Sequence, residues 1–197
     1  MVYLNDDIAH YDWESALPLL SAQRRKQVLK FKHEQGRRTC AAAYLLLCEG
    51  LRKEYGIEEP PVFEYGEHGK PSIVGHADIH FNLSHCREAA LCVVSDRPVG
   101  VDVESIRPFK EQLVCYTMSD AEISRIREAE HPEVEFIRLW TMKEAVLKLI
   151  GTGITNDLKT VLTGQEKIET TVNLEKNYVY SIVFGKKAVP SQTKCQL

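Results

Sequence analysis

Hydrophobic residues recur every three or four positions in two long stretches of the chain, and this spacing predicts helices. The first stretch covers residues 15–56, with Ser21 as a capping residue near its start and Gly56 suited to end it. The apolar positions on one face of this stretch are Cys40, Tyr44, Leu47, Leu51 and Tyr55. The second stretch begins at Pro132, a residue suited to the first helical position, and ends at Gly151.

Apolar and polar residues alternate in the segments between and after these stretches, and this pattern predicts strands. Three such runs lie at residues 78–84, 89–94 and 99–104, and three more at 159–162, 169–172 and 178–184. The chain therefore shows the same order twice, a helical part followed by strands. This order predicts an α+β fold with two similar halves, residues 1–98 and 99–197.

Composition and charge are those of an ordinary globular protein. Of the 197 residues, 44% are hydrophobic and 27% are charged, and the net charge is −3. These values exclude a disordered tail and a coiled-coil rod, and they give no global sign of nucleic-acid or membrane binding. The longest apolar run, Ala41–Cys48, is too short to cross a bilayer. The first residues carry acids where a signal peptide would carry Lys or Arg.

Cysteines stand at positions 40, 48, 86, 92, 115 and 195. None of them forms a Cys-x-x-Cys pair, so the sequence does not support a zinc knuckle or a thioredoxin-type redox pair. We therefore expect reduced structural thiols in a cytoplasmic protein.

One segment departs from the acidic balance of the chain, because residues 24–38 contain seven Lys or Arg and a single acid, Glu34. Such a cationic surface fits a solvated face, a clamp for an anionic ligand, or a docking surface for an acidic partner. Nucleic acid is disfavoured as that partner, since Phe31 is the only aromatic residue in the run.

Two carboxylates lie close together in the predicted strand at residues 99–104. Asp102 and Glu104 are two positions apart, so they share one face of a strand with backbones about 7 Å apart. Gly100 lies on the same face and leaves space beside them. Mg²⁺ prefers oxygen ligands and takes only a few carboxylates, which fits this pair. The alternative is a solvated strand face.

The second predicted helix carries Glu144 and Lys148, which are four positions apart and therefore neighbours on one helix face. They are either a surface ion pair or a metal-side carboxylate followed by a phosphate-binding lysine. In the second case Leu139 and Trp140 anchor the helix in the core. Ser84 and His85 end a predicted strand, where adjacent side chains point apart, so they do not indicate a hydrolase triad.

These features together resemble the 4′-phosphopantetheinyl transferases of the Sfp type. The resemblance covers about residues 25–154 and rests on motifs in the order and spacing of that family. They are Gly69-Lys70-Pro71, Phe81-Asn82-Leu83-Ser84-His85, Val99-Gly100-Val101-Asp102-Val103-Glu104, and Trp140-Thr141-Met142-Lys143-Glu144 followed by Lys148 and Gly151-x-Gly153.

The resemblance implies an enzyme that moves the phosphopantetheine arm of coenzyme A to a serine of an apo acyl or peptidyl carrier protein, releasing 3′,5′-ADP. This is a holo-[acyl-carrier-protein] synthase activity that uses Mg²⁺. The implied fold is a pseudo-dimer of two α+β halves with the active site between them. Asp102, Glu104 and Glu144 match the metal-binding acids of the family, and Lys148 matches the lysine that contacts the pyrophosphate.

The same resemblance implies a set of coenzyme A contacts, which are Arg25, Arg38, Lys70, Ser84, His85 and Lys148. One departure is visible, since Ala22 stands where some members have a second basic residue; Arg24 or Lys26 are candidates to replace it. The general base stays open between Glu144, Glu122 and a metal-bound water.

Three alternative hypotheses for the function are a non-catalytic binding module on the same fold, a Mg²⁺-dependent phosphohydrolase, and a nucleic-acid binder. The three carboxylates together with Lys148 argue against a module that only binds. The implied partners are coenzyme A and a carrier protein with an acidic docking helix, and the pseudo-dimer favours a monomer. The sequence leaves the kind of carrier open.

Overall fold

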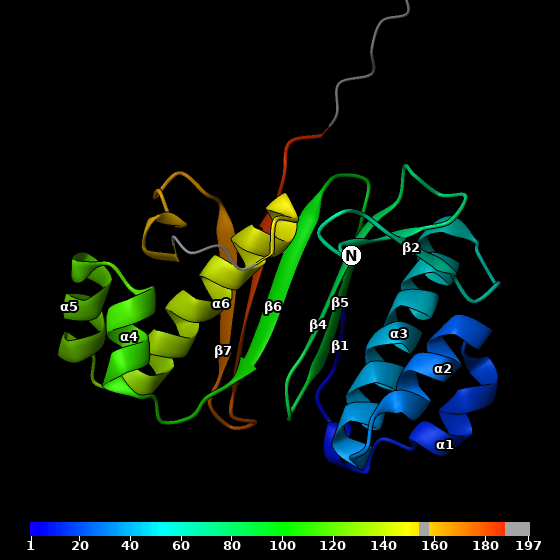
Figure 1. The fold of residues 1–197 in the computed structure, drawn as a ribbon, viewed down its shortest axis with the longest axis horizontal. Helices are drawn as coiled ribbons and strands as arrows, with labels where there is room; N and C mark the ends of the chain where they lie inside the picture. Colours follow the sequence, from blue (N-terminus) through cyan, green and yellow to red (C-terminus); the bar gives the residue numbers. More distant parts are fainter. Residues whose placement is uncertain (154–157, 188–197) are drawn as a thin grey trace, which may run out of the picture.

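The computed structural model describes residues 1–153 and 158–187, which contain two three-stranded antiparallel sheets lying side by side (Figure 1). The strands of the first sheet are, in spatial order, β1 (Val2–Asn5), β5 (Ala90–Ser95) and β4 (His80–His85). Those of the second are β6 (Val99–Ser105), β8 (Tyr178–Phe184) and β7 (Ile168–Asn173). A separate hairpin consists of β2 (Phe63–Tyr65) and β3 (Pro71–Ile73).

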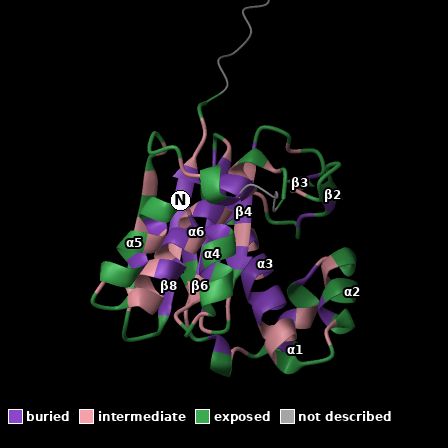
Figure 2. Cartoon of the chain, turned by 60° about the vertical axis from the view of Figure 1, so that its left-hand side comes forward, coloured by how far each residue is buried: buried purple, intermediate pink, exposed green. Residues whose placement is uncertain are grey.

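One long helix packs on each sheet, α3 (Glu34–Tyr55) on the first and α6 (Pro132–Ile150) on the second. Alternate residues of β5 point in opposite directions, so Cys92 packs against α3 while Leu91 and Val93 meet β6 and β8. The layers are therefore helix, sheet, sheet and helix. Figure 2 shows the buried residues gathered in the strands and on the inner sides of α3 and α6. The predicted α+β class is confirmed.

The ends of both long helices follow local sequence rules. Pro132 is the first residue of α6, and Gly56 and Gly151 end α3 and α6 with φ of 69° and 83°, in the left-handed region that favours glycine. The first predicted helical stretch is not one helix. It consists of α1 (Trp13–Ala16), the 3₁₀ turn η2 (Leu17–Leu19), α2 (Ala22–Lys30) and α3. The chain becomes extended at Phe31, which separates α2 from α3.

Most predicted strands are confirmed, but the one at 159–162 is wrong. That segment holds the 3₁₀ turn η3 (Leu158–Thr160), and its apolar residues Leu158, Val161 and Leu162 pack onto neighbouring elements instead of pairing. The remaining elements are the 3₁₀ turn η1 (Ile8–His10) and the helices α4 (Glu111–Thr117) and α5 (Asp120–Glu128).

The five cysteines within the described residues form no disulfide with one another in this structure, and Cys195 lies outside those residues. Within residues 1–153 and 158–187, no helix combines the length and the apolar character needed to cross a bilayer.

Gly100 allows α6 to approach β6 closely. A Cβ atom at this position would lie 2.0 Å from the carbonyl oxygen of Ala145 and 2.5 Å from the backbone nitrogen of Leu149. The prediction that Gly100 leaves space beside the carboxylates is therefore wrong, because the helix backbone fills that space. The face that carries Asp102 and Glu104 is consequently covered by α6 and is not a solvated strand face.

The two sheets meet along the edge strands β4 and β6, where side chains replace backbone pairing. Asn82 Oδ1 accepts a hydrogen bond from the backbone N–H of Val101 at 3.2 Å, and Ser84 Oγ accepts one from the N–H of Val103 at 3.2 Å. Both pairs are 19 residues apart, so the two strands run in the same direction. The predicted strand-end motif thus joins the two sheets.

Replacing Asn82 with alanine is expected to lower the free energy of unfolding by about 1–3 kcal/mol, because the N–H of Val101 would stay buried without an acceptor. Urea denaturation followed by circular dichroism measures this change. Asn5→Ala is the matched control, since Asn5 Oδ1 accepts the N–H of Asp7 at an exposed position where water can replace it; we expect a change below about 0.5 kcal/mol. Equal losses in the two variants would contradict the bridging role of Asn82.

Candidate active site

A cleft of about 280 Å³ opens between the β3–β4 region and the C-terminal part of α6. Its lining includes three residues predicted to bind ligands: Lys70, Glu144 and Lys148. The other lining residues are His68, Gly69, Pro71, Asn82, Leu83, Leu147, Gly151 and Gly153. Motifs that are far apart in the sequence therefore border one cavity.

Asp102 lies beside this cleft and connects the two sheets to α6. Only 4% of the residue is exposed, and its Oδ1 accepts hydrogen bonds from Lys148 Nζ at 2.7 Å and from Ser84 Oγ at 2.9 Å. Lys148 also donates to Ser84 Oγ at 2.9 Å. Of the two roles considered for Lys148, the surface ion pair with Glu144 is not formed, because the lysine pairs with Asp102.

Asp102, Glu104 and Glu144 form what we call the carboxylate centre. The pKa of Glu144 is raised by burial and by the negative charge of Asp102, while Lys148 opposes this shift. The pKa of Glu104 is raised by burial, by Asp102 and, to a smaller extent, by Glu144. The negative charges of the three carboxylates therefore act on one another.

Two oxygens of the carboxylate centre are left without partners. Among the described residues, Asp102 Oδ2 and Glu144 Oε1 are buried and have no hydrogen-bond donor. Within the described ranges, no group of three or more His, Cys, Asp or Glu side chains is placed so that it could hold a metal ion by itself. Mg²⁺ usually takes one or two carboxylates and completes its shell with water and substrate phosphates. The two unpartnered oxygens fit such an open site.

Comparison with known proteins supports the resemblance seen in the sequence. The family model of the 4′-phosphopantetheinyl transferase superfamily matches residues 98–194. A 4′-phosphopantetheinyl transferase of Bacillus pumilus, psf-1, is 32% identical over 158 residues, which are 79% of this chain and 68% of the relative. The chain belongs to the 4′-phosphopantetheinyl transferase superfamily. A 4′-phosphopantetheinyl transferase of Bacillus subtilis is 29% identical over 78% of this chain and 70% of its own length. HetI of Nostoc sp. is 32% identical over 77% and 69%.

His85 lies near Lys148 and near Arg24, an arginine that the sequence offered only as a replacement for a missing basic residue. The pKa of His85 is lowered by desolvation of its ring and by the positive charges of Lys148 and Arg24. The guanidinium of Arg24 lies 5.4 Å from the ring centre of Tyr44, and its Nη2 donates to the carbonyl of Cys40 at 3.2 Å. Its Nε is buried without a partner among the described residues.

Arg25, which is predicted to contact coenzyme A, makes hydrogen bonds to the turn before α2 in this structure. Its Nε donates to the carbonyl of Leu17 at 3.1 Å and its Nη2 to that of Leu20 at 3.4 Å, so it holds the turn before α2. Helix periodicity could have distinguished the two arginines. Position 24 is four residues before the buried Val28 and so lies on the inner face of α2, while position 25 does not.

Arg38 and Lys70 both carry structural hydrogen bonds in this structure. Arg38 donates to the carbonyl of Ala9 and to Glu34 Oε2, and this ties η1 to α3. Lys70 Nζ donates to the carbonyl of Leu149 at 2.8 Å, at the C-terminal end of α6. A positive charge at this end is favourable, because the last carbonyls of a helix carry partial negative charge. Desolvation lowers the pKa of Lys70.

Glu122 belongs to a different cluster from the carboxylate centre. Its Oε2 accepts hydrogen bonds from Lys143 Nζ at 2.8 Å and from the backbone N–H of Ser119 at 2.7 Å, which completes a capping box at the start of α5. Lys143 is fully buried and also donates to the carbonyl of Leu158 at 2.6 Å. Glu122 is not among the described lining residues of the cleft.

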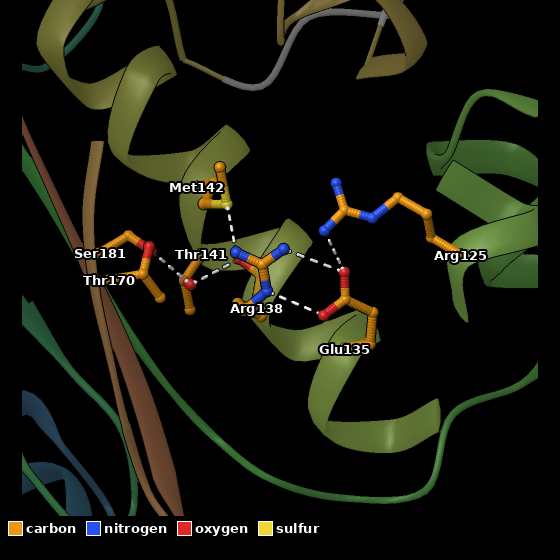
Figure 3. A network of polar contacts seen from close by, with 7 residues as sticks. All are labelled: Arg125, Glu135, Arg138, Thr141, Met142, Thr170 and Ser181. Atoms are coloured by element: carbon orange, nitrogen blue, oxygen red, sulfur yellow. Dashed lines mark hydrogen bonds and ion pairs between the residues drawn. The ribbon is translucent and has the colours of Figure 1, made fainter. Parts of the chain in front are cut away.

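Polar side chains hold α6, and with it Glu144 and Lys148, in place (Figure 3). Thr141 Oγ1 lies 2.9 Å from the buried Ser181 Oγ on β8, which lies 2.9 Å from Thr170 Oγ1 on β7. On the other side of the helix, Glu135 accepts hydrogen bonds from Arg138 and from Arg125 of α5. Of the two predicted anchors of the same helix, Leu139 is buried in the core and Trp140 is partly buried against the same cluster.

Proposed function

We propose that this transferase moves the phosphopantetheine arm of coenzyme A to a serine of an apo acyl or peptidyl carrier protein, with Mg²⁺ as the metal. One observation carries the proposal: the unpartnered buried oxygens of Asp102 and Glu144 lie beside a cleft that also contains Lys70 and Lys148. This arrangement provides oxygen ligands for a cation and, in Lys148, an ammonium group for phosphates. Asp102, Glu144 and the neighbouring Glu104 would hold the Mg²⁺. When bound, the metal neutralises charge on the pyrophosphate of coenzyme A.

Three basic residues are assigned to the phosphates and one to the adenine. Lys148 and His85 would contact the pyrophosphate, since both lie near Asp102. Arg24 replaces Arg25 as the proposed contact of the 3′-phosphate, because Arg24 is the arginine whose charge reaches His85. A guanidinium is well suited to bind phosphate through paired N–H groups. Lys70 is assigned to the adenine.

The transfer is a substitution at the phosphorus that carries the pantetheine arm. The serine oxygen of the carrier protein forms the new P–O bond, the bond to the bridging oxygen breaks, and 3′,5′-ADP leaves. The serine proton needs a base. We assign this role to Glu144 instead of Glu122, because Glu144 lines the cleft while Glu122 is bonded to Lys143 and Ser119.

The proposal extends to the partner and the domain arrangement. The exposed lysines of α2, Lys26 and Lys30, form a basic face that suits an acidic docking helix of a carrier protein. We also propose that residues 1–98 and 99–197 are the two halves of the pseudo-dimer. Each of them contains one of the three-stranded sheets and its long helix.

Intact-protein mass spectrometry tests the proposal directly. An apo acyl carrier protein and an apo peptidyl carrier domain are incubated with the enzyme, coenzyme A and Mg²⁺. We expect a mass gain of one phosphopantetheine arm on at least one carrier, and no gain when EDTA removes the metal. Loss of coenzyme A without any gain on either carrier would indicate a phosphohydrolase instead and would contradict the proposal.

A further inference from the structure

The ammonium group of Lys148 occupies the position beside Asp102 where a cation is needed. Its Nζ is 2.7 Å from Asp102 Oδ1 and 2.9 Å from Ser84 Oγ. The side chain of Asp102 is only 5% exposed, whereas that of Lys148 is 30% exposed and reaches the cleft. Burying a lone carboxylate costs several kcal/mol, so a positive partner is required here. In the ligand-free protein, Lys148 is the positive partner of Asp102.

A divalent cation at Asp102 would meet this ammonium group at close range. Two positive charges a few ångströms apart repel each other strongly when they are shielded from water. In the absence of coenzyme A, a metal ion therefore has to displace Lys148 from Asp102 or bind beside it with weakened affinity. A pyrophosphate in the cleft reduces this repulsion, because its negative oxygens offer Lys148 a partner other than Asp102.

Lys148 can change partners without movement of the main chain. Its flexible four-carbon stem ends in the cleft, where a phosphate would lie. Asp102 stays oriented when the lysine leaves, because Ser84 Oγ still donates to Oδ1 and is itself held by the N–H of Val103. The unpartnered Oδ2 then remains available to the metal.

We propose that Lys148 makes the binding of the divalent metal and of coenzyme A mutually dependent; this inference rests on the proposed function. Without coenzyme A, Lys148 competes with the metal for Asp102. With coenzyme A, it moves to the pyrophosphate and the competition ends. By thermodynamic linkage, coenzyme A strengthens metal binding by the same factor by which the metal strengthens coenzyme A binding.

Isothermal titration calorimetry with Mg²⁺ tests this inference, with and without coenzyme A. In the parent protein we expect Mg²⁺ alone to bind at least about fivefold more weakly than Mg²⁺ in the presence of coenzyme A. Lys148→Met removes the charge and keeps the length of the side chain. In this variant Mg²⁺ alone should bind at least about fivefold more tightly than in the parent, and coenzyme A should strengthen Mg²⁺ binding less than it does in the parent.

Lys53→Met is the matched control, because it removes an exposed lysine whose Nζ pairs with Glu49 and not with Asp102. Its affinity for Mg²⁺ alone should stay within about twofold of the parent. Equal gains in both variants would mean a general charge effect and would overturn the inference. Thermal unfolding adds a second readout: without metal, Lys148→Met should melt below the parent, and Mg²⁺ should raise its Tm more than that of the parent.

The outcomes separate this inference from the proposed function. If the parent binds Mg²⁺ with coenzyme A and Asp102→Asn does not, but Lys148→Met binds Mg²⁺ alone no better than the parent, only the role of Lys148 is wrong. If the parent binds no Mg²⁺ under any of these conditions, or if Asp102→Asn binds it as well as the parent, the metal site itself is wrong. If Lys148→Met does not fold, Lys148→Gln provides the same test.

Discussion

Replacing Asp102 with asparagine is expected to lower the rate of phosphopantetheine transfer by about a thousandfold. Bound metal contributes several kcal/mol of charge stabilisation, and about 1.4 kcal/mol corresponds to a tenfold change in rate. The variant keeps the size of the side chain but removes the charge that would hold the cation. Initial rates of mass gain on the apo carrier protein measure the effect.

The fold of Asp102→Asn should stay intact, because an amide can keep the hydrogen bond with Ser84 and the partly exposed Lys148 can turn to solvent. Asp96→Asn is the matched control: Asp96 is exposed in the turn before β6 and pairs with Lys187. We expect its transfer rate to equal that of the parent. An Asp102→Asn enzyme with a rate within tenfold of the parent would show that Asp102 is not a metal ligand.

Replacing Gly100 with alanine should give the largest loss of stability. The added Cβ would lie 2.0 Å from the Ala145 carbonyl oxygen and 3.0 Å from the Leu149 Cα. These are backbone atoms of α6, so no side-chain rotation relieves the clash and the helix has to move away from β6. We expect a loss of at least about 3 kcal/mol in the free energy of unfolding, at the upper end of the range for overpacking. The corresponding fall in Tm is roughly 6–12 °C.

Gly66→Ala is the control for the Gly100 substitution, because its nearest contact would be the Lys70 carbonyl oxygen at an ordinary 3.8 Å. Its stability should stay within about 0.5 kcal/mol of the parent. Calorimetry of both variants gives the comparison. If Gly100→Ala melts at the temperature of the parent, α6 does not rest on β6 as described.

The residues of the candidate site could be predicted from the sequence only in part. Lys70, Glu144 and Lys148 were singled out from motifs, and they line one cleft. The sequence also suggested Gly100 as open space and Arg25 as a ligand contact. The structure corrects the first, because α6 fills the space at Gly100. Arg25 holds the turn before α2, and its contact with a ligand stays a prediction. The correction at Gly100 depends on α6, an element that lies far away in the chain.

The sequence by itself determined the positions of the long helices, of most strands and of the helix ends, which depend on interactions between residues close together in the chain. The spacing of apolar residues located the long helices and most of the strands, and Pro132, Gly56 and Gly151 marked helix ends, because these signals act within one or two turns. Only the tertiary structure decided which charges meet. Ser84 and Asp102 are 18 residues apart, and Lys148 lies 46 residues from Asp102. Such pairs depend on how β4, β6 and α6 pack together, and side-chain packing over that range leaves no periodic signal in the sequence.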